Sequence, residues 1–385
     1  MIKRSLATKI QQLATKFPVV ALTGPRQSGK STLLKYLFPD YEYVSLEDLD
    51  IRTFAITDPR GFLATYNNHV IIDEAERVPQ LFSYLQTHID KLNEPGMYML
   101  SGSRNFHLME AIDQSLAGRV AILKLLPFSR LELHNGDILP DSIDKQIFTG
   151  FYPRIYDKDI HPTDYYPSYI NTYIERDVRQ ILNVTNLNRF TRFLRLCAGR
   201  IGQLLNKSSL AVEAGVTIPT VDAWISVLEA SYITYCLETN YKNYNKRIVK
   251  SPKLYFYDTG LACSLLGITS ADQVATHYLR GELFENLVIT QFIKNSFNNG
   301  ITPDLTFWRD STGLEVDLIN TIGQDLFAYE IKSGSTFNQS YFNGLKKWSV
   351  ISDTPSDRLA VVYGGESSFK TSFGNVIALP THFTL

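Results

Sequence analysis

Residues 24–31 have the types and spacing that bind phosphate groups. They read GPRQSGKS and match the pattern G-x-x-x-x-G-K-[ST], between an apolar run and a helix-forming run. Glycines let backbone N–H groups converge on phosphate oxygens, and the helix that follows adds its positive dipole end. Lys30 is expected to reach the β- and γ-phosphates of ATP, and the Ser31 hydroxyl to ligate Mg²⁺. The predicted cofactor-binding residues are Gly24, Pro25, Arg26, Gln27, Ser28, Gly29, Lys30, Ser31 and Thr32.

Two acidic residues end the apolar run at residues 69–75, which reads HVIIDEA. Its three β-branched residues predict a buried strand, so Asp73 and Glu74 would lie at the carboxyl end, where parallel α/β sheets bind ligands. We expect Asp73 to hold Mg²⁺ and Glu74 to polarise the attacking water. The alternative is a helix cap, because Asp followed by Glu also suits a first helical turn.

Two further polar residues are candidates for catalysis. Ser103 follows the apolar run at residues 97–101, where a polar side chain could contact the γ-phosphate or the attacking water. Arg119 precedes the apolar run at residues 120–126 and could stabilise transition-state charge, in its own subunit or in a neighbour. The alternative for Arg119 is a surface side chain near a helix C-terminus. A role in a neighbour would require a homo-oligomer.

A second acidic group falls in the last third of the chain. Residues 281–298 predict an amphipathic helix that carries Glu285, and two strand hairpins follow it. The strand period of two and a short turn would place Asp317 opposite Glu330, with Lys332 on the same face as Glu330. Facing carboxylates repel unless a cation lies between them, so Glu285, Asp317 and Glu330 are predicted metal ligands. With Lys332 orienting a water, the group would suit Mg²⁺-dependent phosphodiester hydrolysis; the alternative is a solvated sheet face.

The elements expected around these residues divide the chain into four parts. Residues 1–135 alternate strands with helices, as an α/β nucleotide-binding domain does, and residues 136–200 predict a helical lid or connector, with one helix over 165–183. Residues 201–272 read as two short helices and a β-hairpin, which predicts a winged helix-turn-helix. Residues 273–385 form the last part.

The second helix of that winged motif, expected over residues 219–231, is a poor reader of DNA. It contains no Lys or Arg, although such a helix normally enters the major groove. Basic side chains and tyrosines lie instead in the hairpin, where they could bind DNA phosphates without sequence specificity. The alternatives are a solvated hairpin and a contact between domains. The hairpin residues are Lys242, Lys246, Arg247, Lys250, Lys253, Tyr241, Tyr244 and Tyr255.

Composition describes an ordinary globular chain of two or three domains. The chain has 385 residues, 44% of them hydrophobic, and a net charge of −1, so any contact with a polyanion must be local. Its three cysteines, Cys197, Cys236 and Cys263, form no C-x-x-C pair, which favours a reducing compartment over disulfides or structural zinc. No stretch approaches 18 apolar residues and the N-terminus is amphipathic. We therefore expect no membrane span and a cytoplasmic location.

Together these segments resemble a widespread prokaryotic family of single-chain AAA-type ATPases with a C-terminal domain of unknown function. The resemblance implies ATP and Mg²⁺ at the N-terminal site, a winged helix, and a C-terminal α/β domain of restriction-endonuclease-like fold, whose motif matches Asp317 and Glu330-Ile331-Lys332. The segments are GPRQSGKST, VSLED (44–48), DPRGFL (58–63), VIIDEA, SGSRNF (101–106), SLAGRV (115–120), YIERDVR (173–179), KSPKLYFYDTGLA (250–262) and GELFENLV (281–288).

The leading hypothesis is an ATP hydrolase whose conformational cycle controls DNA engagement, and cleavage, by the C-terminal domain. One alternative is a binding switch, in which ATP holds a conformation that recruits a protein or DNA partner. Another is a scaffold with an inactive nuclease fold. Lys30, Asp73 and Glu74 favour the hydrolase over the pure switch. The acidic second helix of the winged motif counts against sequence-specific transcription control.

Overall fold

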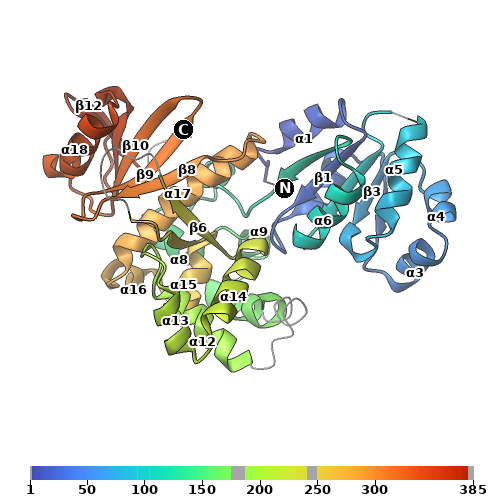
Figure 1. Ribbon diagram of the computed structural model, residues 1–385, viewed down its shortest axis with the longest axis horizontal. Helices are drawn as coiled ribbons and strands as arrows, with labels where there is room; N and C mark the ends of the chain where they lie inside the picture. The colour runs from blue at the N-terminus through green and yellow to red at the C-terminus, as the bar shows by residue number, and fades with distance from the viewer. Residues whose placement is uncertain (1, 93, 104, 175–186, 241–248, 380–385) are drawn as a thin grey trace. The chain divides into compact units, whose positions relative to one another are not determined.

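The computed structural model describes residues 2–92, 94–103, 105–174, 187–240 and 249–379 (Figure 1). They form two compact units. The N-terminal unit comprises Met1–Phe128, Ala230–Tyr232 and Ser296–Ile301, and the C-terminal unit comprises the remaining residues. The main segment of the N-terminal unit ends at Phe128, close to the domain boundary that the sequence predicted at residue 135. The other three predicted parts fall mainly within the second unit.

A five-stranded parallel sheet with the order β2-β3-β4-β1-β5 forms the centre of the N-terminal unit. The predicted α/β fold of this part is therefore confirmed. Because β4 lies between β1 and β3, the carboxyl ends of these three strands are neighbours, although β1 and β3 are far apart in the sequence. The strands are β1 (Val19–Thr23), β2 (Glu42–Ser45), β3 (Val70–Asp73), β4 (Tyr98–Gly102) and β5 (Val120–Lys124).

Helices cover both faces of this sheet, which explains why its central strands are apolar throughout. Val19 and Ala21 of β1 pack in one cluster with side chains of α4, α5 and α6, while Val20 and Leu22 pack in another with α1 and α2. The helices are α1 (Ala7–Ala14), α2 (Lys30–Leu37), α3 (Leu49–Thr57), α4 (Pro59–Thr65), the short η1 (Ala75–Arg77), α5 (Leu81–Leu92) and α6 (Asn105–Ser115).

The C-terminal unit contains an eight-stranded mixed sheet with the order β12-β13-β11-β10-β9-β8-β6-β7. The hairpin that the sequence predicted as a separate wing is β6 and β7, and it joins this sheet because Glu238 and Thr239 pair in parallel with Thr306 and Phe307 of β8. The strands are β6 (Thr234–Thr239), β7 (Lys253–Phe256), β8 (Leu305–Arg309), β9 (Glu315–Ile322), β10 (Asp325–Lys332), β11 (Leu359–Tyr363), β12 (Phe369–Thr371) and β13 (Gly374–Ala378).

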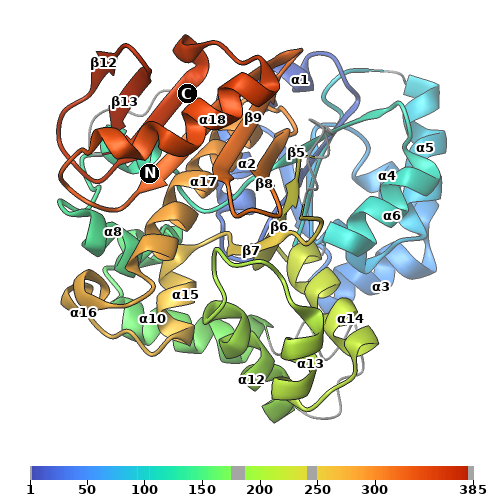
Figure 2. The same cartoon turned by 60° about the vertical axis from the view of Figure 1, so that its left-hand side comes forward.

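Two helices cover opposite faces of this sheet. Phe292 of α17 (Arg280–Asn298) contacts the ring of Tyr329 on β10, whereas α18 (Phe342–Ser352) shares a hydrophobic cluster with Ala328 of β10 and Val361 of β11. Figure 2 shows α18 lying across the strands. Consecutive β10 residues therefore alternate between the two helices, as the strand period requires. The short helices η3 (Gln339–Tyr341) and η4 (Ser356–Arg358) flank α18.

The rest of the C-terminal unit is helical. The helix predicted over residues 165–183 is α10, which contains Pro167 and passes into the π-helix η2; residues 175–183 lie outside the described residues. The helices are α7 (Arg130–Asn135), α8 (Ile143–Thr149), α9 (Pro153–Asp157), α10 (Pro162–Tyr169), η2 (Ile170–Ile174), α12 (Leu187–Ala198), α13 (Lys207–Ala214), α14 (Ile218–Ala230), α15 (Thr259–Leu265) and α16 (Ala271–Thr276).

A sharp turn joins helices α13 and α14, the pair that the sequence predicted as a helix-turn-helix. Their axes are bent by 102°, and Gly215 supplies the left-handed turn between them with φ 69°. Among the described residues, no single helix is long and apolar enough to cross a membrane. The pair α13 and α14 reaches the required length and hydropathy only when both helices are counted together across this bend.

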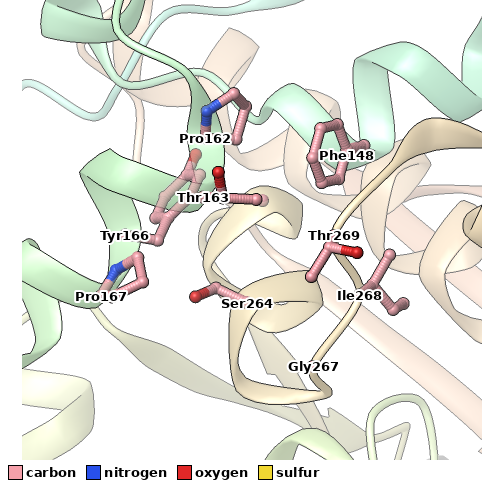
Figure 3. A pocket seen from close by; sticks show the side chains of 10 residues that line it. Phe148, Pro162, Thr163, Tyr166, Pro167, Ser264, Gly267, Ile268 and Thr269 are labelled. Atoms are coloured by element: carbon pink, nitrogen blue, oxygen red, sulfur yellow. The ribbon is translucent and has the colours of Figure 1, made fainter.

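A buried aspartate joins the helices of the C-terminal unit beside a small cavity. Asp258, which is 2% exposed, accepts hydrogen bonds from the Phe151 N–H (2.8 Å), the Tyr166 hydroxyl (2.7 Å) and the Leu261 N–H (3.1 Å). The adjacent cavity has a volume of about 120 Å³, and Tyr166 and Ser264 line it from α10 and α15 (Figure 3). Its ten lining residues carry no charge, and it is smaller than a typical ligand site.

Candidate active site and the acidic cluster

The predicted phosphate loop joins β1 to α2 and depends on its glycines. Gly24 and Gly29 have φ angles of 148° and 92°, and a Cβ atom on Gly24 would lie 2.1 Å from the carbonyl oxygen of Leu125. Gly29 is the last residue before α2 begins at Lys30. The N-terminus of α2 therefore follows directly on the loop, as phosphate binding requires.

Lys30 folds back over this loop. The residue is 7% exposed, and Nζ donates to the carbonyl oxygens of Gly24 (3.0 Å) and Pro25 (2.9 Å). Burial lowers the pKa of Lys30 to about 8, against the opposing effect of nearby carboxylates, with Glu74 first among them. An anionic phosphate at the loop would favour the charged ammonium.

Asp73 accepts hydrogen bonds from three hydroxyl groups. Ser31 Oγ donates to Asp73 Oδ2 over 2.8 Å, Tyr43 OH donates to the same oxygen over 2.7 Å, and Ser101 Oγ donates to Oδ1. The structure thus brings together Ser31 and Asp73, the two residues predicted to hold Mg²⁺ in the N-terminal unit. A hydroxyl and a carboxylate are oxygen ligands of the kind that Mg²⁺ prefers.

Glu74 and Ser103, the predicted water-polarising residue and its polar neighbour, also lie together. Ser103 Oγ donates to Glu74 Oε2 over 3.1 Å, and Arg77 Nε lies 3.8 Å from the same oxygen. Glu74 has φ 52° and ψ 42°, a left-handed conformation that is uncommon for residues other than glycine. Such strained residues are found at active sites more often than elsewhere.

Several residues around the loop were missed by sequence reasoning. Arg4 is buried, and its guanidinium donates to the carbonyl oxygens of Ser28 (2.8 Å) and Leu126 (2.6 Å), so it fixes the base of the loop. Tyr43 and Ser101 were missed as partners of Asp73. None of these three residues belongs to a sequence motif with a fixed spacing. The one available signal was the position of Ser101 at the end of an apolar strand.

A role for Arg119 at the phosphate loop of its own chain is wrong. Arg119 lies at the amino end of β5, where its carbonyl oxygen accepts from the Val19 N–H at the start of β1. The loop follows the opposite end of β1, about 16 Å away along five strand residues. The guanidinium instead pairs with Asp90, at 2.6 Å from Nε to Oδ1. A role in a neighbouring subunit stays a prediction.

In the C-terminal unit, the predicted neighbours Asp317, Glu330 and Lys332 do meet. Tyr329 pairs with Leu318, which places Glu330 next to Asp317 at the end of the β9–β10 ladder. Lys332 Nζ lies 2.6 Å from Glu330 Oε1 and 3.6 Å from Asp317 Oδ2. Asp317 Oδ2 also accepts from the Ile331 N–H over 2.8 Å. The pairing that the strand period predicted is confirmed.

Lys253 of β7 belongs to this group rather than to a DNA-binding wing, which corrects the prediction from its sequence position. Its side chain is 5% exposed, and Nζ lies 3.0 Å from Glu285 Oε1 and 2.5 Å from Glu315 Oε1. Tyr255, also assigned to the wing, is buried and donates its hydroxyl to Glu285 Oε1. Lys250 is exposed. The predicted hairpin residues that lie outside the described residues are Tyr241, Lys242, Tyr244, Lys246 and Arg247.

We define the acidic cluster as Glu285, Glu315, Asp317 and Glu330. Burial raises the pKa of Glu285 to about 7, against the lowering effect of Lys253, and burial followed by the charge of Asp317 raises the pKa of Glu330 to about 8. Burial alone would lower the pKa values of Lys253 and Lys332, but the surrounding carboxylates raise both above their ordinary value. The carboxylates therefore stabilise the two ammonium charges, whereas at Glu285 and Glu330 the effect of burial exceeds the stabilisation that the lysines give to the carboxylate.

The acidic cluster does not have the geometry of a metal site. Within the described part of the chain, no group of three or more His, Cys, Asp and Glu side chains is arranged to hold a metal ion. The predicted ligand set of Glu285, Asp317 and Glu330 is thus not assembled as such, because lysine ammonium groups contact Glu285 and Glu330.

Comparisons with known proteins divide the chain into three matched regions. Residues 16–134 match the family described as an AAA domain. Residues 140–272 match a domain of unknown function (DUF8612), and residues 280–382 match a second one (DUF4143). The chain is 29% identical over 383 residues to the uncharacterized proteins Rv2008c of Mycobacterium tuberculosis and Mb2031c of Mycobacterium bovis, covering 98% of this chain and 83% of each relative.

Two solved structures show weaker likeness. The Walker-type ATPase of Pyrococcus abyssi is 15% identical with a TM-score of 0.47, covering 69% of this chain and 96% of that one. AMPPCP-bound DnaA from Aquifex aeolicus is 13% identical with a TM-score of 0.30, covering 58% of this chain and 85% of that one. Over residues 16–134 the N-terminal unit is thus similar to AAA domains, a class that typically binds ATP with Mg²⁺.

Proposed function

We propose that the protein is a Mg²⁺-dependent ATP hydrolase whose nucleotide cycle controls DNA engagement by the C-terminal unit. The observation that carries the hydrolase assignment is the contact of Ser31 Oγ with Asp73 Oδ2 at 2.8 Å, beside the Glu74–Ser103 pair. These four residues are the expected parts of a phosphoryl-transfer site, placed around the loop that would hold the phosphates.

Each residue has a separate task in this proposal. Lys30 supplies positive charge at the β- and γ-phosphates, and the backbone N–H groups at the start of α2 bind phosphate oxygens. Ser31 and Asp73 would hold Mg²⁺, directly or through water, and the ion would neutralise charge on the phosphate oxygens. Glu74, oriented by Ser103, would position the attacking water and accept its proton.

An ATPase assay on the full chain tests this assignment. Phosphate release should require both ATP and Mg²⁺, and Lys30→Ala should abolish it because the phosphates lose their main counter-charge. The matched control is Lys16→Ala, which removes an exposed lysine of the same unit and should leave turnover unchanged. Turnover that is equal in Lys30→Ala and wild type would refute the assignment.

The proposed DNA engagement is supported by the 102° bend between α13 and α14 and by the basic residues of the neighbouring hairpin segment. The face of α14 does not favour base reading, because it carries Asp222 and Glu229 and no basic residue, and Asp222 pairs with Lys207 at 2.6 Å. We therefore propose modest, non-specific binding through phosphates. Comparing DNA affinity with and without ATP tests whether the nucleotide controls it.

A second candidate function is an ATP-dependent switch or scaffold whose nuclease-like fold is inactive. The pairing of the acidic cluster with Lys253 and Lys332 favours it, because metal-dependent cleavage needs those same carboxylate oxygens. A nuclease assay with Mg²⁺ or Mn²⁺ on several forms of DNA, with and without ATP, distinguishes the two candidates. Cleavage that is lost in Asp317→Asn would favour the nuclease.

A further inference from the structure

Three cations surround the four carboxylates of the acidic cluster, and these groups come from several helices and strands. The carboxylates come from α17, β9 and β10, and the cations are Lys253 of β7, Arg309 of β8 and Lys332 of β10. Arg309 lies 3.1 Å from Glu315, on the rim of the cluster, while Lys253 is almost completely buried. Buried carboxylates need compensating charge, and here the chain itself supplies most of it.

Lys253 occupies a bridging position between two of these elements. Its Nζ atom lies 3.0 Å from Glu285 Oε1 on α17 and 2.5 Å from Glu315 Oε1 on β9. Tyr255, two residues along the same strand, donates to the same Glu285 oxygen. The Lys253 ammonium therefore bridges carboxylates from two different elements, as a bound divalent ion would do.

A divalent ion and the Lys253 ammonium cannot use these oxygens together. Mg²⁺ binds carboxylate oxygens at about 2.1 Å. An ion bound to Glu285 Oε1 would lie near an ammonium already 3.0 Å from that oxygen, so two positive charges would share one small buried space. Metal binding at this position therefore requires Lys253 to leave.

The strand that carries Lys253 is tied to the start of the helix-turn-helix. The Gly202 N–H donates to the Leu254 carbonyl oxygen (2.8 Å), the Leu254 N–H donates to the Gln203 carbonyl oxygen (3.1 Å), and the Leu205 N–H donates to the Pro252 carbonyl oxygen (2.8 Å). Helix α13 begins two residues after Leu205. Moving the β7 backbone so as to withdraw Lys253 from the cluster would therefore break the backbone pairing that leads into α13.

We propose that Lys253 is a built-in cation that takes the place of a divalent metal ion in the acidic cluster. The cluster is then an ion-pair joint that fastens the helix-turn-helix segment to the C-terminal sheet, and it is closed to metal while β7 is in place. This inference is independent of ATP turnover in the N-terminal unit.

The proposal is tested by titrating the nucleotide-free full chain with Mn²⁺. Binding is measured as the decrease in the electron paramagnetic resonance signal of free Mn²⁺. An Asp73→Asn background removes any contribution from the N-terminal site. In that background Lys253→Met should bind one Mn²⁺ at least about tenfold more tightly than the parent, and adding Asp317→Asn should abolish the gain. The matched control is Lys250→Met, which removes an exposed lysine three positions earlier and should not change Mn²⁺ affinity.

A charge-balanced variant keeps the test decisive if Lys253→Met does not fold. Lys253→Met/Glu315→Gln removes one positive and one negative charge and retains Glu285, Asp317 and Glu330 as ligands. It should also gain a Mn²⁺ site. The proposal is overturned if the parent already binds Mn²⁺ in a way that Asp317→Asn removes, or if the charge-balanced variant folds without gaining Mn²⁺ affinity.

Discussion

Ser31 and Asp73 lie 42 positions apart in the chain, yet Ser31 Oγ donates a hydrogen bond to Asp73 Oδ2 over 2.8 Å. The contact results from the strand order, because β4 alone separates the strand before the phosphate loop from the strand that ends at Asp73. It places a hydroxyl and a carboxylate where both can reach one Mg²⁺ ion.

Glu74→Gln should retain ATP binding and slow hydrolysis by about a hundredfold or more. The amide keeps the size and the contact with Ser103 but cannot accept a proton from the attacking water. The measurements are kcat and the Kd for ATP. Glu42→Gln on β2 is an exposed control that should behave as wild type. Equal turnover by Glu74→Gln and wild type would exclude the assigned role of Glu74.

Ser103→Ala should lower kcat by about tenfold without weakening ATP binding. The change removes the hydroxyl that orients Glu74 at 3.1 Å, and a hydrogen bond to a charged group is worth about 1.5–3 kcal/mol. Ser103→Thr should restore much of the rate, because it returns a hydroxyl. If the threonine variant is as slow as the alanine variant, Ser103 acts through packing and not through its hydroxyl.

Arg119 should contribute to hydrolysis only across a subunit interface, since it lies at the far end of the sheet from its own phosphate loop. In that case activity per chain should rise with protein concentration. Mixing Arg119→Ala with Lys30→Ala chains should restore part of the activity, because each supplies the residue that the other lacks. A monomer with concentration-independent turnover would leave Arg119 with a structural role, in its contacts with Asp90 and the Ala117 carbonyl oxygen.

Reversing Lys246, Arg247 and Lys250 to Glu should weaken DNA binding equally on all sequences and flatten its salt dependence, because phosphate contacts release counterions. Binding measured at several salt concentrations checks this. Lys16→Glu, which reverses the charge of one exposed lysine outside the hairpin, is the control for a single charge reversal. Changes at Thr220 or Ser226 on α14 should matter little. A shift in base preference from those changes would show that α14, and not the hairpin, faces DNA.

Asp258→Ala should lower the free energy of unfolding by about 3 kcal/mol. It leaves the buried hydroxyl of Tyr166 and the N–H of Phe151 without their acceptor and removes the cap of α15. Urea denaturation of the full chain measures the loss. Asp157→Ala, which alters an exposed aspartate of the same unit, should cost less than about 0.5 kcal/mol. Similar losses in the two variants would contradict the assigned importance of Asp258.

The features that the sequence predicted correctly depend on local spacing. The phosphate loop needs four fixed positions within eight residues, and its glycines and the following helix are consequences of short-range backbone geometry. The meeting of Asp317 with Glu330 follows from a strand period of two across one short turn. Such relations extend over about a dozen residues, so the pattern of side chains suffices to predict them.

The remaining relations were decided by how distant segments pack. The sequence placed Lys253 on a hairpin wing that could bind DNA, but β6 pairs with β8 and so carries β7 and Lys253 into the acidic cluster. Arg119 follows a helix near an apolar strand, yet strand direction places it away from the loop. The chain alone determined which groups could do chemistry. Strand order and direction in the folded sheets, which optimise burial over the whole chain, determined which of those groups meet.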